Sequence, residues 1–163
     1  MSNASSVPCA SQRPGEVAID LPLATDAGVH FIGRIRTVYA TRDDCPKNGR
    51  ASTAEAVIEL DARYAAGLLD IEHCSHLIVL YWMDEARRDL MHQVPGHLGR
   101  PRGTFALRSP VRPNPIALSV VELLKVEGAK LTIRHIDCRD GTPLIDIKPY
   151  FPTTDSIPDA RRP

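Results

Sequence analysis

The sequence lacks several features that mark common classes of protein. Its four cysteines, Cys9, Cys45, Cys74 and Cys138, are scattered, with no C-x-x-C pair and no cluster of histidines. Neither a disulfide framework nor a zinc site is therefore expected. No apolar run approaches the roughly 20 residues of a membrane-spanning helix, and the polar N-terminus lacks the apolar segment of a signal peptide. We expect a cytoplasmic protein with reduced thiols, no metal and no membrane partner.

The chain also lacks an excess of charge and the commonest ligand-binding motifs. Lys plus Arg and Asp plus Glu each number 20 in 163 residues, so the formal net charge is zero. A phosphate-binding surface would then have to be a local patch. The patterns G-x-G-x-x-G, P-loop, H-E-x-x-H and G-x-S-x-G are absent as well. An ordinary dinucleotide-binding fold would therefore lack its phosphate-binding loop.

Short β-like segments dominate what is present. Alternating or β-branched residues predict strands at 29–39, 56–60, 76–83, 105–108, 117–126, 131–136 and 144–147. Helix-forming residues occur only briefly, over 62–69 after a capping Asp61 and over 84–93. Strands in succession, without regular helical crossovers, argue for a sandwich or barrel. We expect an all-β fold, a small single-sheet barrel-like domain with one or two short helices.

Composition divides the chain into three parts. Residues 1–28 are rich in Ser, Ala, Pro and Asp and predict a flexible N-terminal lead. Residues 29–155 contain every predicted strand, and residues 156–163 are a polar C-terminal tail. Within the domain, residues 76–83 are the most apolar run and predict a central strand buried on both faces. Residues 92–104, with three glycines and two prolines, are typical of a long functional loop.

Two segments are unusual for plain structure. Residues 108–119 (RSPVRPNPIALS) place Arg108, Arg112 and Asn114 among prolines that stiffen the backbone. Rigid guanidinium groups suit carboxylates and phosphates, although they could equally tie loops together through backbone carbonyls. Residues 137–150 (DCRDGTPLIDIKPY) begin with an Asp-Gly turn. That turn is either a plain hairpin or a place where backbone groups meet an adenine or an amino-acid moiety.

These segments together resemble the TsaA-like (TrmO-type) methyltransferases, which methylate N6 of threonylcarbamoyl-adenosine beside the tRNA anticodon. The family segments are found as FIGRI at 31–35, CSHLIVL at 74–80, FALRSP at 105–110, RPNPIALS at 112–119, VEL at 121–123 and DCRDGTPLIDIKPY at 137–150. The resemblance covers about residues 29–155. Leu107 and Ala117 depart from it, because the family usually has Thr and Gly there, and both enlarge a side chain near the implied pocket.

The resemblance implies a barrel-like β fold, bound S-adenosylmethionine, tRNA as substrate and usually a homodimer. The implied cofactor-binding residues are Asn48, Gly49, Arg50, Met83, Asp84, Arg108, Leu118, Asp140, Gly141, Thr142 and Pro143. We expect Arg112, Asn114 and Lys148 to orient the substrate. The general base stays open among Asp137, Asp146 and His76.

Two further points remain open at the level of sequence. Tyr81 and Trp82 are neighbours on one predicted strand and point to opposite sides of it, so at least one is expected in the core, while the other could stack on an adenine. The neutral charge also leaves room for a same-fold methyltransferase acting on a small molecule or another RNA. A non-catalytic sensor that binds S-adenosylmethionine is the third possibility.

Overall fold

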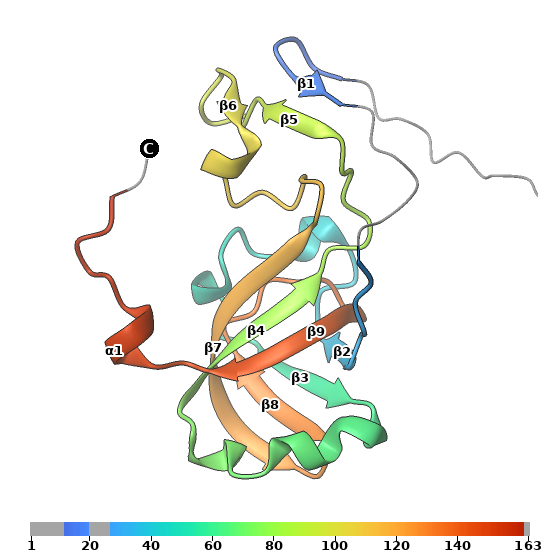
Figure 1. Ribbon diagram of the computed structural model, residues 1–163, viewed down its shortest axis with the longest axis vertical. Helices are drawn as coiled ribbons and strands as arrows, with labels where there is room; N and C mark the ends of the chain where they lie inside the picture. Colours follow the sequence, from blue (N-terminus) through green and yellow to red (C-terminus); the bar gives the residue numbers. More distant parts are fainter. Residues whose placement is uncertain (1–11, 20–26, 162–163) are drawn as a thin grey trace, which may run out of the picture.

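The computed structural model describes residues 12–19 and 27–161. Six strands of the described chain form a closed antiparallel barrel in the order β2-β3-β8-β7-β4-β9 (Figure 1). Their bounds are β2 (Gly33–Arg36), β3 (Glu55–Leu60), β4 (His76–Trp82), β7 (Ile116–Glu127), β8 (Lys130–Arg134) and β9 (Thr142–Pro149). The expected all-β barrel is confirmed, as is the hairpin that β7 and β8 form through Gly128.

Alternating side chains build the core inside this barrel. Along β4, Leu77, Val79 and Tyr81 point inward and are at most 3% exposed, whereas the residues between them are only half-buried. The expectation of a strand buried on both faces is therefore wrong, because the outer face of a barrel strand has no second layer above it here. The complete core consists of Ile35, Ala56, Ile58, Leu68, Leu77, Val79, Tyr81, Val121, Leu131, Ile133, Ile136, Cys138 and Leu144.

The antiparallel order gathers the connections at two ends of the barrel. One end, which we call the rim, carries the connections 37–54, 83–115 and 135–141. The opposite end carries residues 61–75, the β7–β8 turn and the chain after β9. Residues far apart in sequence therefore meet at the rim.

Short helices lie on these connections. The predicted helix at 62–69 is the 3₁₀ helix η3 (Ala62–Leu68), which follows Asp61 without a side-chain capping bond and buries Leu68. η4 (Ile71–His73) comes next, at the same end of the barrel. η1 (Arg42–Asp44) and η2 (Gly49–Ala51) lie on the rim, and α1 (Pro152–Asp155) follows β9.

Residues 84–115, which we call the arm, connect β4 to β7 and extend beyond the rim (Figure 1). In it, β5 (Leu90–Gln93) pairs with β6 (Arg102–Gly103) and with β1 (Val17–Ala18). The helix expected over 84–93 is wrong, because a short isolated helix is marginal and β5 gains two strand partners instead. These strands also occupy part of the expected loop at 92–104.

The strand expected at 105–108 is wrong too. The first two residues of this segment lie in the 3₁₀ helix η5 (Thr104–Ala106), and the Leu107 N–H caps it by donating to the Thr104 carbonyl. The hydroxyl of Thr104 donates to the Leu90 carbonyl at 2.6 Å. The buried hydrogen bond of the Thr104 side chain therefore favours a helical turn here, where the composition of the segment favoured an extended strand.

The ends of the chain are described only in part. Of the expected lead 1–28, residues 1–11 and 20–26 lie outside the described residues, and Val17–Ala18 within it form β1. In the expected tail 156–163, residues 156–161 are exposed and the last two lie outside the description. Within the described chain, no helix has the length and apolar character needed to cross a membrane.

Replacement of one core leucine tests the barrel packing. Leu131→Ala should lower the free energy of unfolding by about 2–5 kcal/mol, because Leu131 is fully buried between barrel strands and its truncation leaves a cavity. Urea denaturation followed by circular dichroism measures the change. Leu69→Ala is the control, since Leu69 is 83% exposed; equal losses in both variants would contradict the proposed core.

Candidate functional site

The segment after β4 contacts the loop before β9 at the rim. The Met83 N–H donates to the Pro115 carbonyl at 2.9 Å, which fixes where the chain leaves the barrel. Two residues on, Glu85 Oε1 lies 2.6 Å from Arg139 Nη2. Asp84 stands exposed between these two anchors. The predicted cofactor residues Met83 and Asp84 are therefore brought close to the turn that begins β9.

Arg108 reaches β7 from the arm. Its Nη2 donates to the Leu118 carbonyl at 2.8 Å, while the side chain as a whole stays exposed. Leu118 and Ile116 on the outer face of β7 are 43% and 41% exposed. A positive charge thus lies beside an apolar surface. Such a pairing suits a ligand that has both a carboxylate and an apolar ring.

The Asp140-Gly141 turn fastens β9 to the chain around β2. The backbone N–H groups of Asp140 and Gly141 donate to the carbonyls of Tyr39 and Ile35, at 2.8 and 2.9 Å. The Thr142 N–H also donates within the turn. Because all three N–H groups already have acceptors, they are not available to a ligand, and of the interpretation in which backbone groups meet a ligand only the carbonyl part remains. Side chains and carbonyl oxygens are what the turn has left to offer.

The side chains at this turn are partly engaged as well. Asp140 Oδ1 accepts the Thr37 N–H at 3.1 Å, and Oδ2 lies 3.6 Å from Arg36 Nη1. Arg34 Nη1 donates to the Gly141 carbonyl at 2.8 Å. Gly141 has φ +77, a conformation that favours glycine. The turn is therefore a rigid part of the rim.

The predicted residues Asn48, Gly49 and Arg50 form a third part of the rim. Asn48 caps η2, since its Oδ1 accepts the Arg50 N–H at 3.0 Å. Gly49 is buried against the β8–β9 connection, where a Cβ would lie 2.3 Å from the His135 carbonyl oxygen. His135 itself has φ 75. This close approach requires glycine at position 49 and leaves the Arg50 side chain exposed.

A buried tyrosine carries a polar cluster just inside the rim. The Tyr81 hydroxyl donates to Asp137 Oδ1 at 3.0 Å and lies 3.0 Å from Ser119 Oγ. Burial, with the nearby Asp137 charge second, raises the pKa of Tyr81 far above its usual value. Tyr81 is therefore a permanent donor that orients Asp137. Its burial confirms that at least one of Tyr81 and Trp82 belongs to the core.

Trp82 points to the outer side of the strand. The centroid of its ring lies 6.4 Å from the centroid of the Phe31 ring. The guanidinium carbon of Arg88 lies 5.5 Å from the centroid of the Trp82 ring. Arg88 Nε also donates to the Pro113 carbonyl at 2.6 Å. The exposed side of Trp82 is thus already flanked by a cation and a second aromatic ring. These contacts link the arm to the barrel.

The cysteine inside the rim is not a nucleophile. Cys138 is fully buried, and burial raises its pKa to about 12. The half-buried Cys45 has its pKa raised as well, chiefly by burial. A raised pKa favours the protonated thiol, which is the less reactive form. Burial and this shift therefore argue against a nucleophilic role for these cysteines.

The structure separates Lys148 from the rest of the predicted site. It lies six residues beyond Thr142 on β9, about 20 Å along the strand, and its Nζ is 2.5 Å from Asp146 Oδ2. His76 begins β4 at the same far end, where its Nδ1 lies 3.1 Å from Ser75 Oγ. Of the three candidate bases, Asp137 is therefore the one at the rim.

Arg112 and Asn114 lie on the rim but differ in what they offer. Arg112 is half-buried, and its Nη2 donates to the carbonyls of Thr104 and Leu107 at 3.3 and 3.0 Å. It thus ties the arm together, as one of the two interpretations of this segment expected. Asn114 has an exposed side chain. Ala117, one of the departures from the family pattern, packs against the barrel core.

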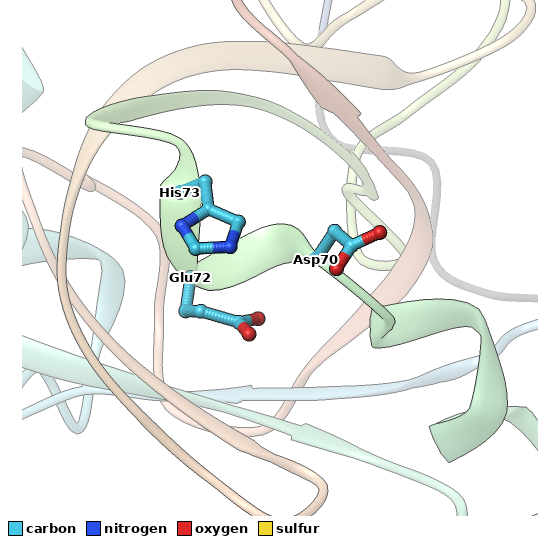
Figure 2. Close-up of side chains that lie close together, drawn as sticks. All are labelled: Asp70, Glu72 and His73. Atoms are coloured by element: carbon cyan, nitrogen blue, oxygen red, sulfur yellow. The ribbon is translucent and has the colours of Figure 1, made fainter.

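Two other features lie apart from the rim residues. A shallow groove of about 520 Å³ covers the outer face of β2 and β3 and shares only Pro143 with the predicted cofactor residues. At the far end of the barrel, Asp70, Glu72 and His73 bring their ligand atoms within 4.8 Å of one another (Figure 2). All three are exposed, and exposed groups of this kind commonly bind nothing. No sequence motif indicates either feature.

The comparison with protein families agrees with the barrel and its rim. Residues 34–156 match the family described as the tRNA-methyltransferase O N-terminal domain. This match includes all six barrel strands apart from the first residue of β2. The chain belongs to this family.

Individual relatives support the same placement. An S-adenosyl-L-methionine-binding protein of Archaeoglobus fulgidus is 48% identical over 77% of this chain and 91% of the relative. The tRNA (adenine(37)-N6)-methyltransferase of Escherichia coli is 36% identical over 79% of this chain and 60% of its own. A crystal structure of TrmO from P. aeruginosa has a TM-score of 0.72 and 33% identity, covering 88% of this chain and 63% of that one.

The lengths of these proteins differ. A second Archaeoglobus fulgidus relative, a probable S-adenosyl-L-methionine-binding protein, is also 48% identical over 80% of this chain, yet the chain spans only 36% of that relative. It likewise spans about three-fifths of the E. coli enzyme and of the solved TrmO. The likeness therefore concerns the barrel domain.

Replacement of Gly49 tests the close contact that holds η2 to the rim. Gly49→Ala should lower the free energy of unfolding by about 1–3 kcal/mol, because its Cβ would meet the His135 carbonyl oxygen at 2.3 Å. Urea denaturation measures the loss. Gly67→Ala is the matched control, since nothing lies within 4 Å of a Cβ there. A loss no larger than that of the control would show that the loop does not pack as described.

Proposed function

We propose that this chain is a methyltransferase that binds S-adenosylmethionine at the rim and methylates N6 of threonylcarbamoyl-adenosine beside the anticodon of tRNA. The family membership over residues 34–156 is the observation that carries this proposal. The names of the relatives support it, since they include S-adenosyl-L-methionine-binding proteins and a tRNA (adenine(37)-N6)-methyltransferase. Two stretches of the motifs of the resemblance, 112–115 and 140–143, lie at the rim.

The side chains of the rim suit the chemistry of this cofactor. The exposed guanidinium of Arg108 would bind its carboxylate, and the Asp84 carboxylate would attract its ammonium group. Met83 and Leu118 supply apolar surface for the adenine. When bound, S-adenosylmethionine supplies a methyl group activated by a positively charged sulfur. The protein's part is to align that group with the acceptor and to exclude water.

Methylation of a urea-like nitrogen requires a proton acceptor. The acceptor nitrogen loses its N–H bond as its bond to carbon forms, and we infer that Asp137 takes the proton. Tyr81 holds Asp137 Oδ1, whereas Oδ2 makes no hydrogen bond within the described chain. One oxygen is therefore fixed while the other is available. Asp146 is paired with Lys148 and His76 lies at the far end.

We also infer that the protein works as a homodimer in the cytoplasm. The resemblance implies a homodimer, and the half-exposed Ile116 and Leu118 on β7 support one. Apolar side chains gathered beside a ligand site are commonly covered by a partner. Transfer RNA, the substrate proposed above, is a cytoplasmic molecule.

Calorimetric titration with S-adenosylmethionine tests the cofactor site. We expect saturable binding to the purified chain and a loss of about 10- to 100-fold in affinity in Arg108→Ala, since a hydrogen bond to a charged group contributes about 1.5–3 kcal/mol. ATP and NADH serve as ligand controls. Arg63→Ala is the matched variant, because Arg63 is exposed at the far end of the barrel and stacks on Tyr64. Equal affinity of both variants for S-adenosylmethionine would show that Arg108 does not contribute to the cofactor site.

Substitution of Asp137 tests the proton transfer. Asp137→Asn should lower turnover about 100-fold or more, with cofactor affinity unchanged. Asn retains an acceptor for Tyr81, so the fold should persist. Mass spectrometry of nucleosides from tRNA incubated with the enzyme gives the rate, and Asp146→Asn is the control. Binding of S-adenosylmethionine by the unaltered chain without any transfer to tRNA would instead indicate a sensor.

A further inference from the structure

The arm concentrates positive charge in a chain whose net charge is zero. Residues 90–115 of the arm contain four arginines, two histidines and neither Asp nor Glu, and its first six residues, 84–89, add two arginines and three acidic residues. The chain as a whole has as many acidic as basic residues. A local excess of this kind attracts a polyanion even where the whole molecule is neutral.

Two of these arginines have no partner in the described part of the chain. Arg112 donates to backbone carbonyls, and Arg108 donates to the Leu118 carbonyl. The exposed side chain of Arg100 makes no hydrogen bond or ion pair with any described residue. The same holds for the half-buried side chain of Arg102, whose Nε is buried without an acceptor. The Arg100 guanidinium, and the terminal nitrogens of Arg102, are therefore not engaged within the described chain and could contact phosphate.

An aromatic ring three residues after Arg102 faces solvent. Phe105 is 80% exposed, the highest exposure of any described aromatic or aliphatic side chain apart from Leu69. The backbone beside it is anchored, because its neighbour Thr104 is 1% exposed and hydrogen-bonded to Leu90 and to Gln93 Nε2. An exposed ring on an anchored backbone is a platform on which a base can stack.

We propose that the arm is an RNA-binding surface, on which Phe105 stacks against an unpaired base while Arg100 and Arg102 contact neighbouring phosphates. This inference rests on the proposed function and adds to it the surface that would hold the RNA. Unpaired bases in loops expose the ring faces that a paired stem hides. An acidic peptide could pair with the arginines, but it carries no nucleobase to stack on the Phe105 ring.

The position of the arm agrees with this role. The arm extends from the ends of β4 and β7, beyond the rim (Figure 1). Arg108, three residues after Phe105, returns to β7 through its bond to Leu118. A loop of RNA held by Phe105 would therefore lie next to the proposed cofactor residues. The arm would anchor the RNA, and the rim would act on one base of it.

Binding of labelled RNA tests this surface. Fluorescence anisotropy would compare the complete chain with a tRNA anticodon stem-loop and with a fully paired stem of equal length. We expect Phe105→Ala to weaken stem-loop binding about 10-fold and to leave the salt dependence unchanged. The Arg100→Ala/Arg102→Ala variant should lower the slope of log affinity against log salt by about 1.4, for two lost phosphate contacts. Phe151→Ala is the aromatic control, 56% exposed after β9, and Arg63→Ala the cationic one.

Two further measurements separate this inference from the proposed function. Calorimetry with S-adenosylmethionine on Phe105→Ala should give the wild-type affinity. If the chain binds RNA in a way that depends on Phe105 but does not bind S-adenosylmethionine, the RNA-binding role of the arm is supported and the proposed methyltransferase activity is refuted. If RNA binding is absent, or equally strong in Phe105→Ala, the RNA-binding role of the arm is refuted. Light scattering that shows Phe105→Ala to be half the mass of the wild type would refute it as well, since the ring would then cover a second copy.

Discussion

The pairing of β9 with both β2 and β4 is the constraint on which this structure depends. Leu144 lies opposite Gly33 on one side and opposite Tyr81 on the other. Without this strand the sheet would have two open edges, and the core would be open to water. Gly33 permits the closure, because a Cβ there would lie 2.1 Å from the Glu59 carbonyl oxygen. In a closed antiparallel barrel the connections alternate between the two ends. The register in which β9 pairs with β2 and β4 therefore determines which connections meet at the rim.

The closure of the barrel also explains why the Asp137 carboxylate is held in one orientation. Tyr81 and Ser119 face the barrel interior from β4 and β7, and their hydroxyl groups lie 3.0 Å apart where the core ends. Asp137 lies on the β8–β9 connection, and its Oδ1 accepts a hydrogen bond from the Tyr81 hydroxyl. A buried polar group is stable only when it has a partner. The three residues therefore satisfy one another, and the packing that closes the barrel also orients the carboxylate.

Much of this arrangement could be predicted from the sequence, and the exceptions have physical reasons. Strand positions followed from alternation, as Gly33 and Ile35 on β2 illustrate, with the exposed Arg34 and Arg36 beside them. The helix expected over 84–93 failed because pairing with β1 and β6 outweighs a weak local preference, and no local pattern reveals that partner. Likewise, residue types suggested that Lys148 belongs to the site, but its place on β9 depends on how far the strand runs from the rim. The Asp140 turn offered N–H groups in sequence, yet tertiary contacts use them.

Net charge alone does not decide for or against an RNA substrate, because it averages over regions that differ. Several acidic residues of the barrel are neutralised locally: Glu59 lies beside Arg36 and Lys130, and Glu122 beside Arg134. Salt screens exposed charges beyond about 8–10 Å, so an approaching polyanion senses mainly the charges near its point of contact. In residues 90–115 those charges are all positive. A neutral chain can therefore present a strongly basic arm, and the balance of charge in the whole molecule does not argue against an RNA substrate.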